Sequence, residues 1–188
     1  RGFLLGGTSG RTTLNGEGLQ HEDGHSHILA NTIPNCVTYD PTFAHEVAVI
    51  MHHGMKRMVE QQENVFYYIT LLNENYPMPG LTVGTEEQII KGMYMCKPGA
   101  VPPQDTSGAS EKRVQLLGSG TILRESIAAQ TLLAADWGIQ ADVWSCPSFN
   151  ELTREGQDAE RWNLLHPLET PRVPFVAQQL GTSSGPVV

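Results

Sequence analysis

The chain has 188 residues, and its 12 Lys and Arg are outnumbered by 20 Asp and Glu, which gives a formal net charge of −8. This length suits one large domain or two small ones. Hydrophobic residues make up 39% of the chain and charged residues 17%, a balance that excludes a disordered chain. The acidic surplus argues against nonspecific nucleic-acid binding. No apolar run approaches the ~18–20 residues of a membrane span.

The three cysteines, Cys36, Cys96 and Cys146, lie far apart and are odd in number. They predict neither a disulfide framework nor a paired-cysteine metal site, so we expect a reducing, cytoplasmic compartment. The chain starts at Arg1 without an initiator Met or a signal-peptide pattern, and it stops after a structured-looking stretch. We therefore expect an internal piece of a longer protein.

The first half of the chain predicts a βαβ unit behind a glycine-rich loop. Residues 1–32 show little periodicity, and a loop this long and rich in Gly is more often functional than a linker. Cys36–Tyr39 predicts a short strand, and Asp40-Pro41 predicts the N-cap and first turn of a helix. Apolar residues recur at helical spacing after it: Phe43, Val47, Ile50, Met51, Met55 and Met58. The apolar run Val65–Leu72 predicts a buried strand parallel to the first.

The second half predicts further α/β structure after a connector. Residues 73–112 are punctuated by Pro and Gly, with a short helix predicted over Glu86–Met95. The elements predicted after it are a strand at Val114–Leu117, a helix at Ile122–Trp137 closed by Gly138, a strand at Ala141–Trp144 and a helix at Asn150–Leu165. Trp137, Trp144 and Trp162 are interpreted as packing residues.

The densest group of reactive side chains is Asn15–His27, which holds three His and three carboxylates within 13 residues. Histidine serves proton transfer and metal binding near neutral pH, and glycine lets the backbone approach a ligand closely. One hypothesis is a metal site of His21, His25, His27 and Asp23, although this spacing matches no known metal-binding signature. The other is a set of polar side chains lining the pocket of an organic cofactor or substrate.

Two further motifs favour structural interpretations. His45, His52 and His53 fall on a predicted helix, where polar-face or interface histidines are the simpler interpretation. Gly118-Ser119-Gly120 follows a strand and opens a helix, like half of a dinucleotide-binding fingerprint. Leu123 stands at the third glycine position, so a phosphate-binding loop is only weakly indicated.

The stretch Gly10–His27 resembles the homodimeric type of pyruvate dehydrogenase, the thiamine-dependent decarboxylating component of the bacterial pyruvate dehydrogenase complex. It is more distantly similar to the GEDGPTH loop of transketolases. The similarity continues through Ile33–Cys36, Leu72–Tyr76 and Val114–Gly120, and it is plain again in Leu165–Pro174. It covers the chain apart from a divergent connector near 78–112. His21 and His25 stand where a transketolase has Gly and Pro, which favours the pyruvate dehydrogenase branch.

The resemblance implies a fold of the α/β class, with parts of two transketolase-like domains joined by a linker and incomplete at both ends. Residues 1–76 would be the later part of the central pyrimidine-binding-type domain, with an active-site loop at 10–32. Residues 77–112 would form the interdomain connector, and 113–188 the earlier part of the C-terminal domain. The implied catalytic residues are His21 and Glu17, with Asp23, His27 and Gln20 along the substrate channel.

The resemblance also implies an activity. The parent enzyme would decarboxylate pyruvate oxidatively with thiamine diphosphate and Mg²⁺, and pass the acetyl group to lipoyl groups of a dihydrolipoyl acetyltransferase. It would be a homodimer without nucleic-acid or membrane partners, and its main cofactor-binding residues would lie outside this chain, with no metal ligand inside it. The isolated piece is expected to be inactive. The alternatives are another transketolase-group thiamine enzyme acting on a different 2-oxo acid, or a metal-binding or structural domain built on the His-rich loop.

Overall fold

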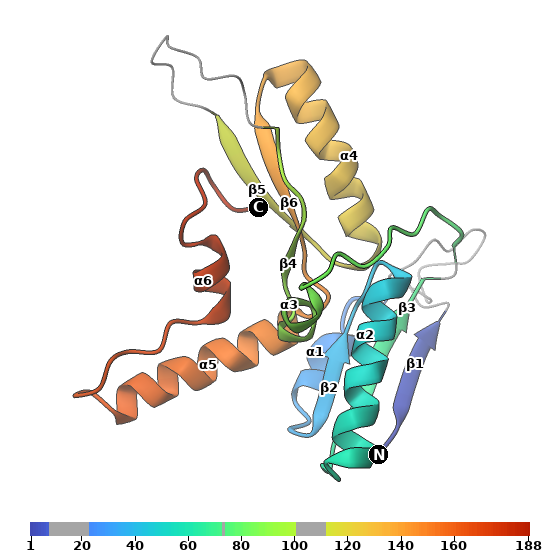
Figure 1. The fold of residues 1–188 in the computed structure, drawn as a ribbon, viewed down its shortest axis with the longest axis vertical. Helices are drawn as coiled ribbons and strands as arrows, with labels where there is room; N and C mark the ends of the chain where they lie inside the picture. The colour runs from blue at the N-terminus through green and yellow to red at the C-terminus, as the bar shows by residue number, and fades with distance from the viewer. Residues whose placement is uncertain (8–22, 73, 101–111) are drawn as a thin grey trace.

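The computed structural model describes residues 1–7, 23–72, 74–100 and 112–188. Two sheets of three strands each dominate this part of the chain, and helices cover both of them (Figure 1). The mixed α/β class predicted from the sequence is therefore confirmed. No helix within the described ranges is long and apolar enough to cross a membrane.

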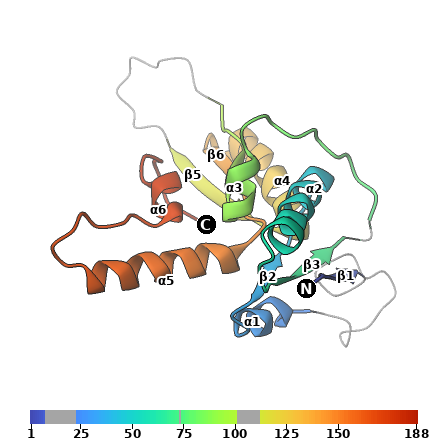
Figure 2. The ribbon, with the colours of Figure 1, turned by 60° about the horizontal axis from the view of Figure 1, so that its bottom comes forward.

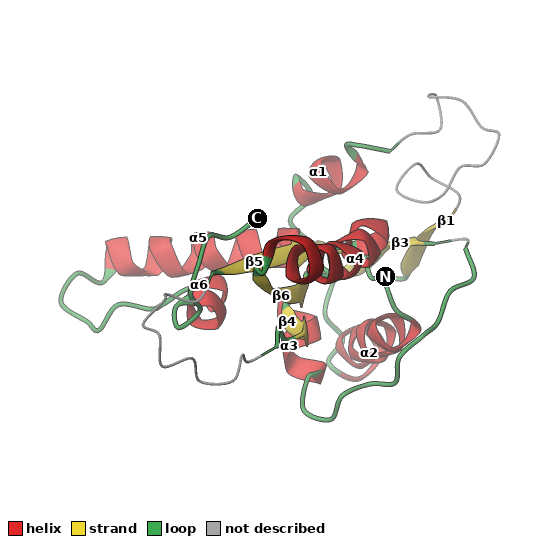
Figure 3. Cartoon of the chain, turned by 90° about the horizontal axis from the view of Figure 1, so that it is seen from above, coloured by secondary structure: helices red, strands yellow, loops and turns green. Residues whose placement is uncertain are grey.

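The first sheet has the order β1-β3-β2 and is entirely parallel. Its strands are β1 (Phe3–Gly7), β3 (Phe66–Leu71) and β2 (Cys36–Tyr39). Helix α2 (Ala44–Met55) continues as the π-helical turn η2 (Lys56–Glu60) and connects β2 to β3, which confirms the predicted βαβ unit. The short helix α1 (Ser26–Asn31) lies across the sheet from α2 (Figures 2 and 3). Strand β1 was not predicted, because its glycines resemble those of the loop that follows.

The predicted start of α2 was wrong, and the difference matters for the site. Asp40 does not cap the helix, which begins at Ala44. Instead, the buried carboxylate of Glu46 reaches back and accepts hydrogen bonds from the amides of Thr42 and Phe43, at 2.6 and 3.0 Å. The carboxylate of Asp40, which lies before the helix, is thereby left for contacts with other parts of the chain.

The second sheet has the order β4-β6-β5, with β5 and β6 parallel and β4 antiparallel to β6. Its strands are β4 (Tyr94–Lys97), β6 (Gln140–Ser145) and β5 (Arg113–Gly118). Helix α4 (Gly120–Trp137) connects β5 to β6 and ends at Gly138, whose left-handed φ of 62° confirms the predicted C-cap. The 77–112 segment is more than a connector, because it contributes β4 to this sheet and α3 (Glu86–Lys91) to the packing against α2.

The C-terminal region contains the long helix α5 (Phe149–Leu165) and a short helix α6 (Phe175–Leu180) that the sequence did not predict. Helices α4 and α6 lie on opposite sides of the second sheet (Figure 1). Val143 faces the α4 side and packs near Leu123, whereas its neighbour Trp144 packs on the α6 side with Phe175. The last residues run beside β5, where the amide of Val188 donates to the carbonyl of Gln115 at 2.8 Å.

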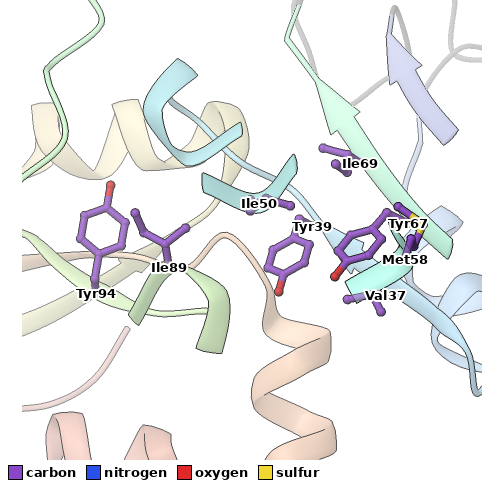
Figure 4. Packing of buried hydrophobic residues seen from close by; sticks show 8 residues of the cluster. All are labelled: Val37, Tyr39, Ile50, Met58, Tyr67, Ile69, Ile89 and Tyr94. Carbon is purple, nitrogen blue, oxygen red and sulfur yellow. The ribbon is translucent and has the colours of Figure 1, made fainter. Parts of the chain in front are cut away.

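The largest buried apolar cluster joins the two halves. Its members come from the first sheet, α2, η2, α3 and β4: Val37, Tyr39, Ile50, Met58, Tyr67, Ile69, Ile89 and Tyr94 (Figure 4). Ile89 and Tyr94 come from the predicted connector, so that segment closes the core of the first sheet. Of the three tryptophans, Trp144 is buried as predicted, but Trp137 is 72% exposed and does not serve internal packing.

Candidate active site

Polar side chains converge where the carboxyl end of β2 meets the carboxyl ends of β5 and β6. A small cavity of about 40 Å³ marks this junction, a size that suits an ordered water better than an organic ligand. Its lining comes from both halves of the chain: His27, Thr38, Asp40, Ser119, Cys146, Pro147, Ser148, Phe149 and Asn150. The carboxyl ends of parallel strands are where open α/β folds bind ligands, because the connecting loops meet there.

His27 is the predicted site residue that the structure places at this junction. It lies in the first turn of α1, with its Nε2 atom 3.0 Å from Thr70 Oγ1. Its ring centroid is 5.2 Å from that of Tyr68. Its backbone carbonyl accepts a hydrogen bond from Asn150 Nδ2 at 2.8 Å. The ring is therefore held by the first sheet and its backbone by the start of α5.

Asp23, the other described member of the predicted channel, helps to form the start of α1. Its Oδ1 atom accepts hydrogen bonds from the amides of His25 and Ser26, at 3.2 and 2.9 Å, and its Oδ2 accepts one from the Ser26 hydroxyl. These bonds hold the N-cap residue His25 and the first helical residue Ser26, so they fix how the chain enters α1. In the structure Asp23 thus orients the segment that carries His27, and its role along the channel stays a prediction.

Asp40 is nearly buried, with 9% of its surface exposed. Its Oδ1 atom accepts a hydrogen bond from Thr70 Oγ1 at 2.5 Å, and its Oδ2 accepts one from Ser119 Oγ at 3.0 Å. Its amide donates to the carbonyl of Pro147 at 2.7 Å. The side chain therefore links the first sheet to the turn that opens α4.

The Gly118-Ser119-Gly120 turn binds this aspartate in the structure. The amide of Gly120 donates to the carbonyl of Asp40 at 3.1 Å, and its carbonyl accepts from Thr42 Oγ1 at 2.8 Å. Gly120 has a φ of 50°, and a Cβ there would come within 2.9 Å of both Asp40 carboxylate oxygens. The N-terminus of α4, which favours an anion, is thus occupied by a carboxylate of the chain itself.

A second buried carboxylate lies deeper at the same junction. Glu46 Oε1 accepts hydrogen bonds from Tyr94 OH at 2.7 Å and from Ser145 Oγ at 2.6 Å. Burial, together with this carboxylate, moves the pKa of Tyr94 far above its ordinary value. Burial, and then the charge of Glu46, raises the pKa of Cys146 to about 12. Cys146 lines the cavity, but its thiol stays neutral at physiological pH and is unsuited to act as a nucleophile.

The other predicted site residues lie either outside the described part of the chain or away from the cavity. Glu17, Gln20 and His21 lie outside the described residues, so their roles remain predictions. The four-residue metal hypothesis includes His21 and is likewise untested; among residues 1–7, 23–72, 74–100 and 112–188, no three His, Cys, Asp or Glu side chains form a group that suits a metal ion. His45 bonds Tyr94 OH and the carbonyl of Pro79, each at 3.1 Å, and does not line the cavity.

Sequence reasoning missed Asp40, Thr70 and Asn150 as members of this junction. A usable signal was present for two of them. Asp40 follows the predicted strand Cys36–Tyr39, and Thr70 lies near the end of the predicted strand Val65–Leu72. Because parallel strands that pair along a sheet end at the same edge, polar residues at both ends are expected to approach each other. Asn150 depends on how the two halves dock, which no local pattern reports.

Comparison with known proteins gives consistent matches along the chain. The family model of the pyruvate dehydrogenase E1 component middle domain matches residues 1–79, and that of the transketolase-like C-terminal domain matches residues 92–188. The pyruvate dehydrogenase E1 component of Cupriavidus necator is 58% identical over 100% of this chain. That of Escherichia coli K12 is 63% identical over 95% of it. The chain spans about a fifth of these relatives, 20% and 19% of their lengths.

Solved structures agree on the fold. A transketolase from Pichia stipitis, in complex with sedoheptulose 7-phosphate, superposes with a TM-score of 0.55 at 18% identity, over 81% of this chain and 20% of its own. Transketolase from Campylobacter jejuni gives a TM-score of 0.50 at 17% identity, over 85% of this chain and 22% of its own. At these identities the likeness supports a shared fold.

Proposed function

This chain belongs to the pyruvate dehydrogenase E1 component family, with a transketolase-like C-terminal part, and on that premise we propose that it forms part of an enzyme that oxidatively decarboxylates pyruvate. The observation that carries the proposal is the identity of 58% over the whole chain, His-rich loop included. The activity belongs to a longer protein, since the relatives in this family are about five times as long as this chain.

We assign the proton chemistry of this segment to the His-rich loop. His21 is the proposed proton donor and hydrogen-bond partner of the pyruvate-derived oxygen, and Glu17 orients or tunes it. Gln20, Asp23 and His27 are proposed to line the substrate channel. The support from the structure is that α1 carries His27 to the junction of both sheets, where Thr70 and Asn150 hold it. A positioned imidazole of this kind contributes roughly 10²–10⁴-fold to a proton-transfer step.

Thiamine diphosphate, when bound, would supply the electron sink for decarboxylation. The described residues fit a role beside the substrate and do not fit the diphosphate or its metal. The helix N-terminus that follows β5 is occupied by Asp40, and no group of three potential metal ligands lies within the part of the chain that the structure describes. We therefore place the diphosphate and Mg²⁺ on other parts of the longer protein.

The proposed partners follow from the same family membership. The enzyme acts as a homodimer, and the acetyl group passes to a lipoyl group of a dihydrolipoyl acetyltransferase. Exposed apolar side chains on α1 and on the α5–α6 connection, such as Leu29 at 67% and Leu168 at 99%, leave surface for such contacts.

The test uses the full-length protein that contains this segment. We expect pyruvate-dependent CO₂ release in the presence of thiamine diphosphate and Mg²⁺, and slower turnover with longer 2-oxo acids. His21→Ala should lower kcat by about 100-fold or more while the affinity for thiamine diphosphate changes little. His52→Ala, an exposed histidine on α2, is the matched control and should match the wild type.

Each contrary result identifies an alternative. Faster turnover of a longer 2-oxo acid would assign the protein to another thiamine-dependent enzyme of the transketolase group. Stoichiometric zinc that is lost in His21→Ala or His25→Ala, without turnover of any 2-oxo acid, would instead support the metal-binding loop. Unchanged kcat in His21→Ala would remove that residue from the mechanism.

A further inference from the structure

The side chain of Thr70 lies between His27 and Asp40. Its Oγ1 atom is 2.5 Å from Asp40 Oδ1 and 3.0 Å from His27 Nε2. Thr70 is 2% exposed, so water is largely kept from these hydrogen bonds. The three side chains come from different elements: α1 carries His27, the end of β2 precedes Asp40, and β3 carries Thr70.

The hydrogen positions in this chain of bonds follow from the chemistry of the groups. A threonine hydroxyl has one proton to donate, and a carboxylate oxygen only accepts. Thr70 therefore donates to Asp40, and its oxygen accepts from His27. The hydrogen on His27 must then sit on Nε2, which leaves Nδ1 as the nitrogen that gains or loses a proton.

The second half of the molecule fixes both His27 and Asp40, the two ends of this row of hydrogen bonds. Asp40 Oδ2 accepts from Ser119 Oγ at 3.0 Å, and the backbone of Asp40 bonds Gly120 and Pro147. The carbonyl of His27 accepts from Asn150 Nδ2 at 2.8 Å. The orientation of the imidazole thus depends on how the turn before α4 and the start of α5 dock on the first sheet.

We propose that Thr70 and Asp40 are positioning residues, which fix the Nε2–H tautomer and the ring orientation of His27 through the chain His27–Thr70–Asp40–Ser119. This inference rests on the proposed function, because it gives His27 a place beside the substrate. Neither Thr70 nor Asp40 needs to touch the substrate. Their effect reaches the reaction only through the imidazole, and this dependence distinguishes them from residues that merely stabilise the fold.

The experiment compares Thr70→Val, Thr70→Ser and Tyr39→Phe in the full-length enzyme, by pyruvate-dependent CO₂ release. Thr70→Val keeps the shape and removes the hydroxyl, and we expect kcat to fall by about 10- to 100-fold with a smaller change in KM. Thr70→Ser restores the hydroxyl and should recover most of the activity. Tyr39→Phe is the matched control, since it removes the hydroxyl of a buried side chain that bonds the carbonyl of Ile90, away from this junction; it should lower the melting temperature and leave kcat within about twofold.

A double-mutant cycle with His27→Ala makes the dependence measurable. If Thr70 acts through His27, adding Thr70→Val to His27→Ala should lower kcat by less than about twofold. An undiminished effect of Thr70→Val in that background would overturn the proposal, and so would wild-type kcat in Thr70→Val alone. A wild-type enzyme without pyruvate-dependent CO₂ release would overturn the proposed function instead, so the two failures are distinguishable.

Discussion

At the residue scale, burial decides the chemistry of the three thiols. Burial, and then the charge of Glu46, raises the pKa of Cys96 to about 11 and that of Cys146 to about 12. Burial also raises the pKa of Cys36. Only the thiolate attacks electrophiles, so a raised pKa protects a thiol until the pH approaches that value. The cysteines are thereby removed from the candidates for covalent catalysis, even though Cys146 lines the cavity beside Asp40.

Because burial raises the pKa values of these thiols, their reaction with an alkylating reagent can be predicted. At pH 8 only about one Cys146 side chain in ten thousand is ionised, so iodoacetamide should leave Cys146 of the native protein unmodified. On raising the pH, Cys96 should react before Cys146, because its pKa is lower and its side chain is less buried. Peptide mass spectrometry measures each site, and alkylation in denaturant is the control. Rapid modification of native Cys146 at pH 8 would contradict this account.

At the element scale, the start of α2 depends on one buried carboxylate. Glu46 accepts two amide hydrogen bonds from the residues before the helix and two hydroxyl hydrogen bonds from the second sheet and its edge. A carboxylate with no exposed surface needs this many donors to offset the loss of its hydration. The helix start and the contact between the halves are therefore set by the same side chain.

Removing the Glu46 carboxylate should loosen both the start of α2 and the contact between the two halves of the molecule. We expect Glu46→Ala to lower the free energy of unfolding by roughly 3 kcal/mol, because it leaves the Ser145 hydroxyl and two amides buried without this acceptor and leaves the Tyr94 hydroxyl with His45 alone. Glu46→Gln keeps one carbonyl oxygen and should cost less. Hydrogen exchange of the amides at Thr42 and Phe43, together with melting temperature, measures the effect. Glu60→Ala, at an exposed carboxylate in η2, is the control. Equal loss in both variants would show that Glu46 has no special role.

The elements differ in how far the sequence could predict them. Strands β2, β3, β5 and β6 and helices α4 and α5 carry apolar patterns or caps of their own, and their predicted bounds lie within two residues of the observed ones. Strand β1 depends on pairing with β3, and β4 depends on pairing with β6, across 45 or more residues of sequence. Neither strand has a pattern that distinguishes it from nearby loop. Asp40 was misplaced for a related reason, since its partners Thr70 and Ser119 lie far along the chain.

The residues of the candidate site likewise divide into those that the local sequence predicts and those that depend on distant contacts. The composition of the loop predicted His27 as a functional residue, and the fold does place it at the junction of both halves. The residues that hold it come from β3 and from the first turn of α5. Those contacts depend on docking rather than on local sequence, so they became visible only in three dimensions.

At the scale of the whole molecule, one arginine attaches α5 to the first half. Arg154 donates to the carbonyl of Cys36 at 2.6 Å, and to those of Ile33 and Asn31 at 3.1 and 3.3 Å. It also pairs with Glu151 at 3.1 Å. These contacts join α5 to β2 and to the end of α1, which keeps Asn150 within reach of His27. The docking of the halves and the geometry of the site are therefore coupled through this side chain.

The ionisation of Glu151 adds a pH dependence to this docking. Burial raises the pKa of Glu151, and the charges of Arg154 and Arg57 lower it back only in part. A carboxyl group with a raised pKa in the folded state favours folding while it is protonated. Its stabilising contribution is complete below the ordinary pKa near 4.5 and is lost as the pH rises through the folded-state value. Without Arg154 the pKa of Glu151 should rise further, and the ionised form should cost more.

We therefore expect Arg154→Met in the full-length protein to lower stability by roughly 3 kcal/mol at pH 8, and by less at pH 5. Arg161→Met, at an exposed position of the same helix, removes the same charge and should have little effect at either pH. Adding Glu151→Gln to Arg154→Met should abolish the difference between the two pH values, because no carboxylate then remains to ionise. Melting temperatures of the wild type and the three variants, at both pH values, measure these stability differences. If the stability loss of Arg154→Met is the same at both pH values, the ionisation of Glu151 plays no part. The hydrogen bonds from Arg154 to the backbone carbonyls would then account for the attachment of α5 by themselves.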